Sequence, residues 1–221
     1  MRSYRMIFLL MVFLPLSLLS QSNELLVKIT TKLSRSETTI SALLSDSTLN
    51  SLHSLIAFRE IIRQNARAEK ITIVNGSEPG DKITVSGIVL DKVGNKMSDK
   101  LIYIYQTSSE GWYSDTAPHI LQMEGDRKHA RLFGYLRSDK DGRFQFSTIK
   151  PKGYPNSSLP AHIHIEISLA QGKNLITELL FDDDPRLIPE IRARAIQEKF
   201  IITKNTGTKS EPLYTYIIQA D

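Results

Sequence analysis

The stretch AHIHIEISLA, residues Ala161–Ala170, combines β-branched isoleucines with two histidines placed two residues apart. In a β-strand, side chains two residues apart point to the same face of the sheet. The stretch therefore predicts a strand with His162 and His164 on one face, while Ile163 lies on the other. Two imidazoles on one face can chelate a single metal ion, but an exposed or hydrogen-bonded pair would have the same spacing.

The segments on both sides of this stretch are also short, rich in β-branched residues and separated by turns. The turn sequences KVGN, KDG and QGKN carry the Gly, Asn and Asp residues that tight turns require. Short strands at this spacing predict an antiparallel β-sandwich over residues 71–221. The predicted strands lie in KITVSGIVLD, KLIYIYQT, ARLFGYLRSD, RFQFSTI, AHIHIEISLA, LITELLF and EPLYTYIIQA, with a helix around Pro189–Lys199 before the last of them.

Residues 23–70 differ in character from this β-rich part, and we predict an N-terminal helical segment. From Ser47 to Ala68, leucines and isoleucines recur at helical spacing, which indicates one amphipathic helix with Ser47 as its N-cap. The preceding part, Asn23–Asp46, has a weaker helical pattern and is rich in serine and threonine. We expect the apolar stripe of the amphipathic helix to pack on the main domain.

The first 22 residues have the layout of a secretory signal peptide. Arg2 and Arg5 precede an apolar run, and Ser20 and Ser22 provide a small-x-small cleavage site. The run is shorter than the ~20 residues that span a bilayer, which argues against a membrane anchor. We therefore predict a secreted or periplasmic protein that is not held in a membrane once the signal is removed.

The composition excludes some classes of partner. The chain of 221 residues has a net charge of +4, which falls further once Arg2 and Arg5 are removed. This balance does not favour nucleic acid or a charged membrane surface as a partner. Because the chain has no cysteine, an exported form must gain its stability from core burial or a metal rather than from disulfides.

Two loop tyrosines could extend the histidine pair into a metal site. Tyr154 lies in the Gly-Tyr-Pro turn of KPKGYPN, and Tyr113 follows the single tryptophan in SSEGWYSD. Loop tyrosines are usually surface aromatics, and spacing alone selects neither of them. Two phenolate oxygens with two imidazole nitrogens would suit ferric iron, a hard ion that lowers the phenol pKa far enough to bind the phenolate.

Several motifs in a fixed order resemble the intradiol ring-cleavage dioxygenases, the family of catechol and protocatechuate dioxygenases. The resemblance covers roughly Ile83–Pro185 and implies a β-sandwich of the intradiol type with a non-haem Fe(III) ion. The motifs are VSGIVLDKVGN, GWY, FSTIKPKGYP, PAHIHIEIS and LITELLFDDDP. Carried over by motif, the implied metal ligands are Tyr113, Tyr154, His162 and His164.

The resemblance also implies a reaction and its substrates. The protein would bind a catechol-like aromatic and, with O2, open the ring between its two hydroxylated carbons, as in aromatic compound catabolism. Tyr113 and Tyr154 are the implied catalytic residues, because a phenolate released from the metal would act as a base. Of the two, we expect Tyr154 to be the permanent ligand. The sequence does not decide whether the protein forms a homo-oligomer.

Two positions of the implied substrate pocket depart from the family pattern. Leu159 stands where the family has an arginine that stabilises negative charge on the substrate, and Glu178 replaces a glutamine. Loss of such a charge-stabilising group can cost roughly 100- to 1,000-fold in rate. A carboxylate near a dianionic substrate would repel it unless it is protonated or turned away.

Other basic residues could restore the missing charge, and other histidines could take part. The candidates for compensation are Arg137, Arg143 and Lys152. We interpret His119 and His129 as surface residues rather than substrate contacts.

Three hypotheses therefore remain. The first is an exported Fe(III)-dependent intradiol dioxygenase. The second is a catalytically weak or inactive metal-binding β-sandwich module that binds a phenolic ligand or a protein partner. The third is a domain that binds zinc or copper through His162 and His164.

Overall fold

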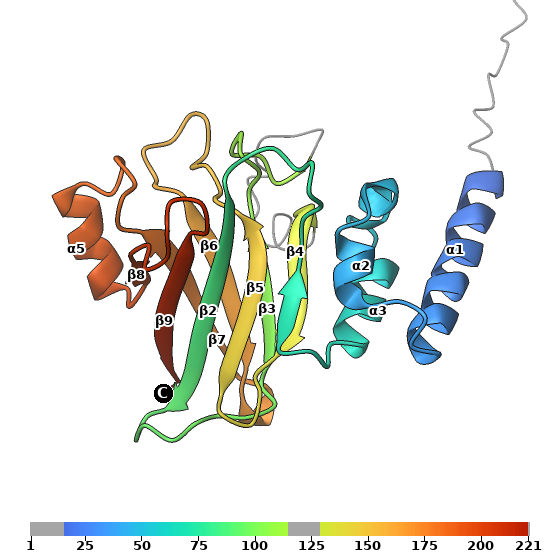
Figure 1. Cartoon of the computed structure of the whole chain (residues 1–221), viewed down its shortest axis with the longest axis horizontal. Coiled ribbons are helices and arrows are strands. Elements are labelled where there is room, and N and C mark those ends of the chain that lie inside the picture. The colour runs from blue at the N-terminus through green and yellow to red at the C-terminus, as the bar shows by residue number, and fades with distance from the viewer. Residues whose placement is uncertain (1–15, 115–128, 221) are drawn as a thin grey trace, which may run out of the picture.

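The computed structural model describes residues 16–114 and 129–220, which form two packed β-sheets with helices beside them (Figure 1). One sheet has the strand order β1-β5-β2-β9, and the other has the order β4-β3-β6-β7-β8. The strands are β1 (Lys70–Thr72), β2 (Lys82–Asp91), β3 (Leu101–Gln106), β4 (Leu132–Arg137), β5 (Arg143–Ile149), β6 (His162–Ser168), β7 (Asn174–Phe181), β8 (Ile201–Thr203) and β9 (Leu213–Ala220).

The predicted sandwich is confirmed, but its sheets are mixed rather than wholly antiparallel. Strand β2 pairs antiparallel with β5, and β3 and β6 are at the centre of an antiparallel run with β4 and β7. The pairs β1–β5, β2–β9 and β7–β8 are parallel, and each includes an edge strand. Parallel neighbours need a crossover instead of a hairpin, and α5 (Pro189–Gln197) provides it between β7 and β8.

The predicted alternation along β6 is confirmed. Ile163, Ile165 and Ile167 are fully buried in the main hydrophobic core. His162 and His164 therefore lie on the outer face of the five-stranded sheet. Because β6 has β3 on one side and β7 on the other, both histidines are held in the middle of a sheet.

The core between the sheets combines aromatic and branched aliphatic side chains. Phe144 and Phe146 of β5 and Val85 of β2 belong to the same buried cluster as Ile104 of β3 and Leu179 of β7. Full burial of one such side chain stabilises a fold by about 1.5–3 kcal/mol. The sheet that carries the histidines is thus supported by a large core on its other face.

The N-terminal helices lie beside the β4 end of the sandwich, with α1 farthest from the sheets (Figure 1). They are α1 (Leu16–Ser34), α2 (Ile40–Leu44), the 3-10 helix η1 (Ser47–Leu52) and α3 (Ile56–Gln64). Contacts join α2 to β1 and α3 to β4, so a helical segment packed on the main domain is observed.

The prediction of a single helix from Ser47 to Ala68 is wrong, because the helix is interrupted between η1 and α3. The η1 helix is capped by Asp46, whose side chain accepts a hydrogen bond from the amide of Thr48. At the break, the buried His53 ring stacks on Phe58 at 5.4 Å between centroids, and its Nδ1 lies 2.7 Å from the carbonyl oxygen of Arg131. These tertiary contacts outweigh the local helical preference.

The predicted signal peptide falls largely outside the described residues. The start of α1 overlaps its last part, at Leu16, and cleavage stays a prediction. Among the helices of the described ranges, none combines the length and the apolar character that crossing a bilayer requires.

Candidate metal centre

The four side chains predicted as metal ligands meet at one point on the outer face of the five-stranded sheet. The phenol oxygen of Tyr113 lies 2.7 Å from that of Tyr154 and 2.8 Å from Nε2 of His164. The phenol oxygen of Tyr154 lies 3.1 Å from Nε2 of His162. Two oxygens and two nitrogens from four separate positions therefore face one another.

The two tyrosine-bearing loops are held against each other by closely packed backbone. Gly111 has a positive φ of 84°, and a Cβ atom there would lie 2.5 Å from the carbonyl oxygen of Gly153. Thr107 Oγ1 donates a 2.7 Å hydrogen bond to the carbonyl oxygen of Lys152. The amide of Lys152 donates in turn to Ser108. Gly111 thus allows the close approach of the two loops, which is a common reason for glycine in a functional loop.

Tyr105, which the sequence did not single out, supports His164 from the neighbouring strand. It pairs with His164 in the β3–β6 register, and the two rings stack at 4.3 Å with an angle of 8° between their planes. Tyr103 then stacks on Tyr105 at 5.3 Å. The only signal in the sequence is the alternation in KLIYIYQT, which puts both tyrosines on one face.

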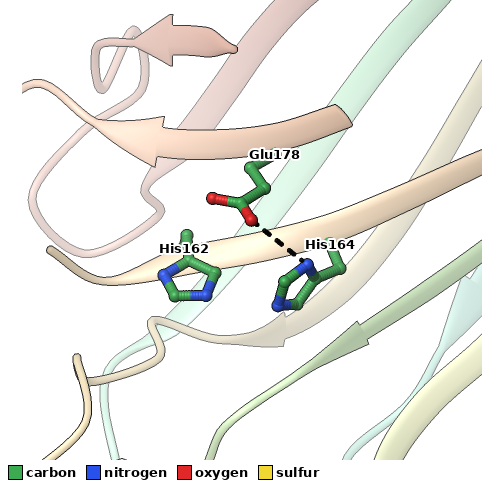
Figure 2. Close-up of side chains that lie close together, drawn as sticks. All are labelled: His162, His164 and Glu178. Atoms are coloured by element: carbon green, nitrogen blue, oxygen red, sulfur yellow. Dashed lines mark ion pairs between the residues drawn. The ribbon is translucent and has the colours of Figure 1, made fainter. Parts of the chain in front are cut away.

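In both histidines the Nδ1 atom lies near a hydrogen-bond acceptor, and the Nε2 atom points to a phenol oxygen. His162 Nδ1 lies 2.9 Å from the carbonyl oxygen of Pro160. His164 Nδ1 lies 3.5 Å from Oε1 of Glu178, its partner across the β6–β7 pair (Figure 2). Metal-binding histidines usually donate their second ring N–H to such a carbonyl or carboxylate.

The hydrogen count fits a cation at the point where the four side chains meet. With both Nδ1 atoms protonated, the Nε2 atoms carry lone pairs, and only the two phenol hydrogens are available for three contacts of 2.7–3.1 Å. One of the three contacts then has no hydrogen between its two atoms, so that two lone pairs face each other. A cation bound by deprotonated phenols would remove this conflict, and phenolate with imidazole is a donor set suited to ferric iron.

Burial at this point favours neutral imidazole. Tyr113 is only 1% exposed, whereas Tyr154 is half-buried. Burial, assisted by the nearby charge of His162, holds the pKa of His164 well below its ordinary value of 6.5. His164 therefore keeps the lone pair that a metal ligand needs at neutral pH.

Glu178 offers an alternative third ligand. One donor atom from each of His162, His164 and Glu178 lies within 4.8 Å of the others, and two histidines with one carboxylate are a known ligand set for ferrous iron. We favour the tyrosine set, because the Glu178 carboxylate faces Nδ1 of His164, not the Nε2 side where the phenols lie. Glu178 then acts as the partner that orients His164.

In the metal-free protein, ionisation of Glu178 lowers the stability of the folded state. Burial raises the pKa of Glu178 above its ordinary value of 4.5, and the Glu198 carboxylate adds to this, while the charges of His162 and Arg194 oppose it. Because the folded-state pKa is raised, the favourable contribution of Glu178 is present below pH 4.5 and is lost as the pH rises through the raised value.

We therefore expect Glu178→Gln to be more stable than the unchanged protein at neutral pH when both are metal-free. The difference should shrink as the pH falls below 4.5, because both side chains are then neutral. Urea unfolding at several pH values in the presence of a chelator measures it, with the exposed Glu190→Gln as control. A Glu178→Gln protein that is less stable at neutral pH would show that the carboxylate stabilises the site.

The other residues singled out from the sequence have the following places in the described structure. Leu159, 43% exposed, belongs to the loop between Tyr154 and His162. Arg137 is bound to Asp99, and His129 is exposed as expected.

No contact in the described part of the chain brings Arg137, Arg143 or Lys152 to the four side chains. His119 lies outside the described residues. The described structure therefore gives no support to the possibility that one of these three basic residues replaces the missing charge.

The sequence reasoning also missed two residues of the turn after β7. Asp184 Oδ2 accepts a 2.8 Å hydrogen bond from the amide of Ala161, directly before His162. Arg186 Nη1 donates to the carbonyl oxygens of Tyr154 and Leu159. Their only sequence signal is the DDDPR turn, which does not reveal its partners.

Comparison with known proteins places this arrangement in a family. A family model described as "Dioxygenase" matches residues 58–218. The protocatechuate 3,4-dioxygenase beta chain of Burkholderia cepacia is 32% identical over 125 residues, which are 53% of this chain and 52% of that protein. The chlorocatechol 1,2-dioxygenase of Rhodococcus opacus is 28% identical over 149 residues, which are 60% of this chain and 55% of that protein.

A solved structure shares the fold. The dioxygenase domain of a dioxygenase carbohydrate-binding protein fusion from Streptomyces sp. SirexAA-E superposes with a TM-score of 0.54 at 23% identity, covering 71% of this chain and 89% of that domain. The chain spans about half the length of the two curated relatives. With the family model matching most of the chain, this protein belongs to the intradiol ring-cleavage dioxygenase family.

Proposed function

We propose that this protein is an exported, non-haem Fe(III)-dependent intradiol dioxygenase that uses O2 to cleave a catechol-like ring between its two hydroxylated carbons. The observation that carries the proposal is the meeting of two phenol oxygens and two imidazole Nε2 atoms within 2.7–3.1 Å contacts. The family is generally iron-dependent, and the relatives quoted above are named for catechol-type substrates.

In this proposal, Tyr113, Tyr154, His162 and His164 hold the iron. When bound, ferric iron supplies the Lewis acidity that binds the substrate as a catecholate and makes its ring reactive toward O2. The Nδ1 contacts of the two histidines, to Pro160 and Glu178, fix the direction of their Nε2 lone pairs. The protein side chains would orient the substrate and accept its protons.

Burial favours Tyr154 as the phenolate that leaves, opposite to the expectation from the sequence. Tyr113 is 1% exposed and also contacts His164, so the surrounding protein holds it in place. Tyr154 is half-buried, so its ring is less enclosed than that of Tyr113. The released oxygen of Tyr154 would accept a proton from the incoming catechol, which is general base work.

Export is the second part of the proposal and rests on the N-terminal sequence alone. The basic residues, the apolar run and the small residues at Ser20 and Ser22 support it. The mature enzyme would then meet its aromatic substrate in the periplasm or outside the cell.

Oxygen consumption with a panel of catechols tests the reaction. We expect the iron-loaded protein to consume O2 with at least one of catechol, chlorocatechol, hydroxyquinol or protocatechuate, and to release a ring-opened diacid detected by mass spectrometry. Tyr113→Phe should lose this activity, whereas the exposed His129→Ala should keep it. Iron-loaded protein that consumes no O2 with any of them would contradict the proposal.

A second candidate is a metal-binding module without strong catalysis. Leu159 in place of the family arginine, and Glu178 in place of the glutamine, favour it. It predicts that iron and a catechol bind, with a change in the visible spectrum, but that no O2 is consumed.

A further inference from the structure

Arg186 connects the two ends of the loop that carries Tyr154. Its Nη1 atom donates to the carbonyl oxygen of Tyr154 at 3.1 Å and to that of Leu159 at 3.3 Å. Guanidinium is always charged in proteins, so both hydrogen bonds are charge-assisted and stronger than neutral ones. One side chain thus spans the segment from the tyrosine to the position where the family has arginine.

Gly153 provides the space for this side chain. A Cβ atom at this position would lie 2.5 Å from Arg186 Nη1 and 2.5 Å from the carbonyl oxygen of Leu159. Real Cβ atoms do not approach other atoms so closely, so any residue with a side chain would displace the guanidinium or the loop. Gly153 and Arg186 therefore form one fitted arrangement.

The turn that carries Arg186 also holds the start of β6. Asp184 Oδ1 accepts a 2.7 Å hydrogen bond from the amide of Arg186, and its Oδ2 accepts a 2.8 Å hydrogen bond from the amide of Ala161. Ala161 directly precedes His162. The turn after β7 is thus bonded to the segment of one predicted ligand through Asp184, and to the loop of another through Arg186.

We propose that Arg186 is a positioning residue that fixes the Tyr154 loop, and with it the Tyr154 phenol, for metal binding. The iron part of this inference rests on the proposed function; the loop part does not. The structural support of this loop thus comes from the turn after β7. Arg186 acts through the backbone carbonyls and does not contact the phenol oxygen in the described structure.

Arg186→Ala tests the proposal in two forms of the protein. In the metal-free full chain, amide hydrogen exchange of peptides covering residues 154–160 should become at least about tenfold faster, because the loss of even one charge-assisted hydrogen bond has about this effect. In the iron-loaded protein, the metal affinity measured by chelator competition should fall roughly 10- to 100-fold, as for other residues that orient ligands. The visible tyrosinate–iron band should also shift.

Matched variants separate positioning from general damage. Arg186→Lys should restore part of the iron affinity and of the visible band, because lysine keeps the charge and one donor group. Arg192→Ala removes the same kind of charge from α5, where Arg192 pairs with Asp182 at 2.6 Å, and should change neither the exchange of residues 154–160 nor the visible band. If Arg186→Ala fails to fold, Arg186→Met keeps an unbranched side chain of similar length without any donor, and it should give the same acceleration.

Unchanged exchange of residues 154–160 in Arg186→Ala, or in Arg186→Met where that variant is used, would overturn the proposal. So would equal effects of Arg186→Ala and Arg192→Ala. If the unchanged protein binds no iron at all, the proposed function fails, while the exchange comparison in the metal-free protein still decides whether Arg186 holds the loop.

Discussion

Replacing His162 with alanine is expected to reduce bound iron from about one per chain to a trace. His162 is 6% exposed, and its Nε2 faces the Tyr154 oxygen at 3.1 Å. Outer partners of metal-bound histidines alone are worth about 10- to 100-fold in affinity, and a direct ligand contributes more. Iron content after gel filtration and chelator competition measure the loss.

The matched control is His129→Ala, which removes an exposed histidine of the same domain and should leave the iron content unchanged. Thermal unfolding of the metal-free His162→Ala protein should show that the sheet still folds, because the core face of β6 is formed by isoleucines. Full retention of iron in His162→Ala would place the metal elsewhere and contradict the ligand assignment.

Replacing Leu159 with arginine is expected to accelerate ring cleavage by about 100-fold, with 1,000-fold as the upper end. Removal of one preorganised group that stabilises developing charge costs about this much in other enzymes. Leu159 is 43% exposed, so a longer side chain can be accommodated without overpacking the core. The gain should be found in kcat, measured by oxygen uptake under saturating catechol.

Leu159→Gln is the control for this variant, because it adds length and polarity without a charge and should stay near the original rate. An equal gain from glutamine would show that shape, not charge, limits the reaction. No gain from arginine, with iron content unchanged, would show that the departure at Leu159 is not what limits the chemistry.

Periodicity and turn chemistry were sufficient to predict most of the sandwich. The alternation in β5 and β6 follows directly from one face being buried, so the sequence alone predicts the strand RFQFSTI and the shared face of the two histidines. The edge strands β1 and β8 have three residues each, too few for a pattern. The break between η1 and α3 depends on His53 packing against Phe58, a contact that helical spacing does not encode.

The candidate site was predictable only in part, for a similar reason. His162 and His164 share a face because of local strand geometry, but Tyr113 and Tyr154 join them through loops that are distant in sequence. Their meeting was inferred from the resemblance, not from spacing. The supports from Tyr105 and Arg186 depend on strand register and on a turn, and no pattern in the sequence reveals these partners.

The visible spectrum of the iron-loaded protein is the most direct test of the central claim, that tyrosinates and imidazoles together hold ferric iron. We expect a red to burgundy protein with about one iron per chain, and a visible band that weakens or shifts in both Tyr113→Phe and Tyr154→Phe. A protein that binds stoichiometric ferric iron but is colourless, or whose spectrum is unaffected by either substitution, would contradict it.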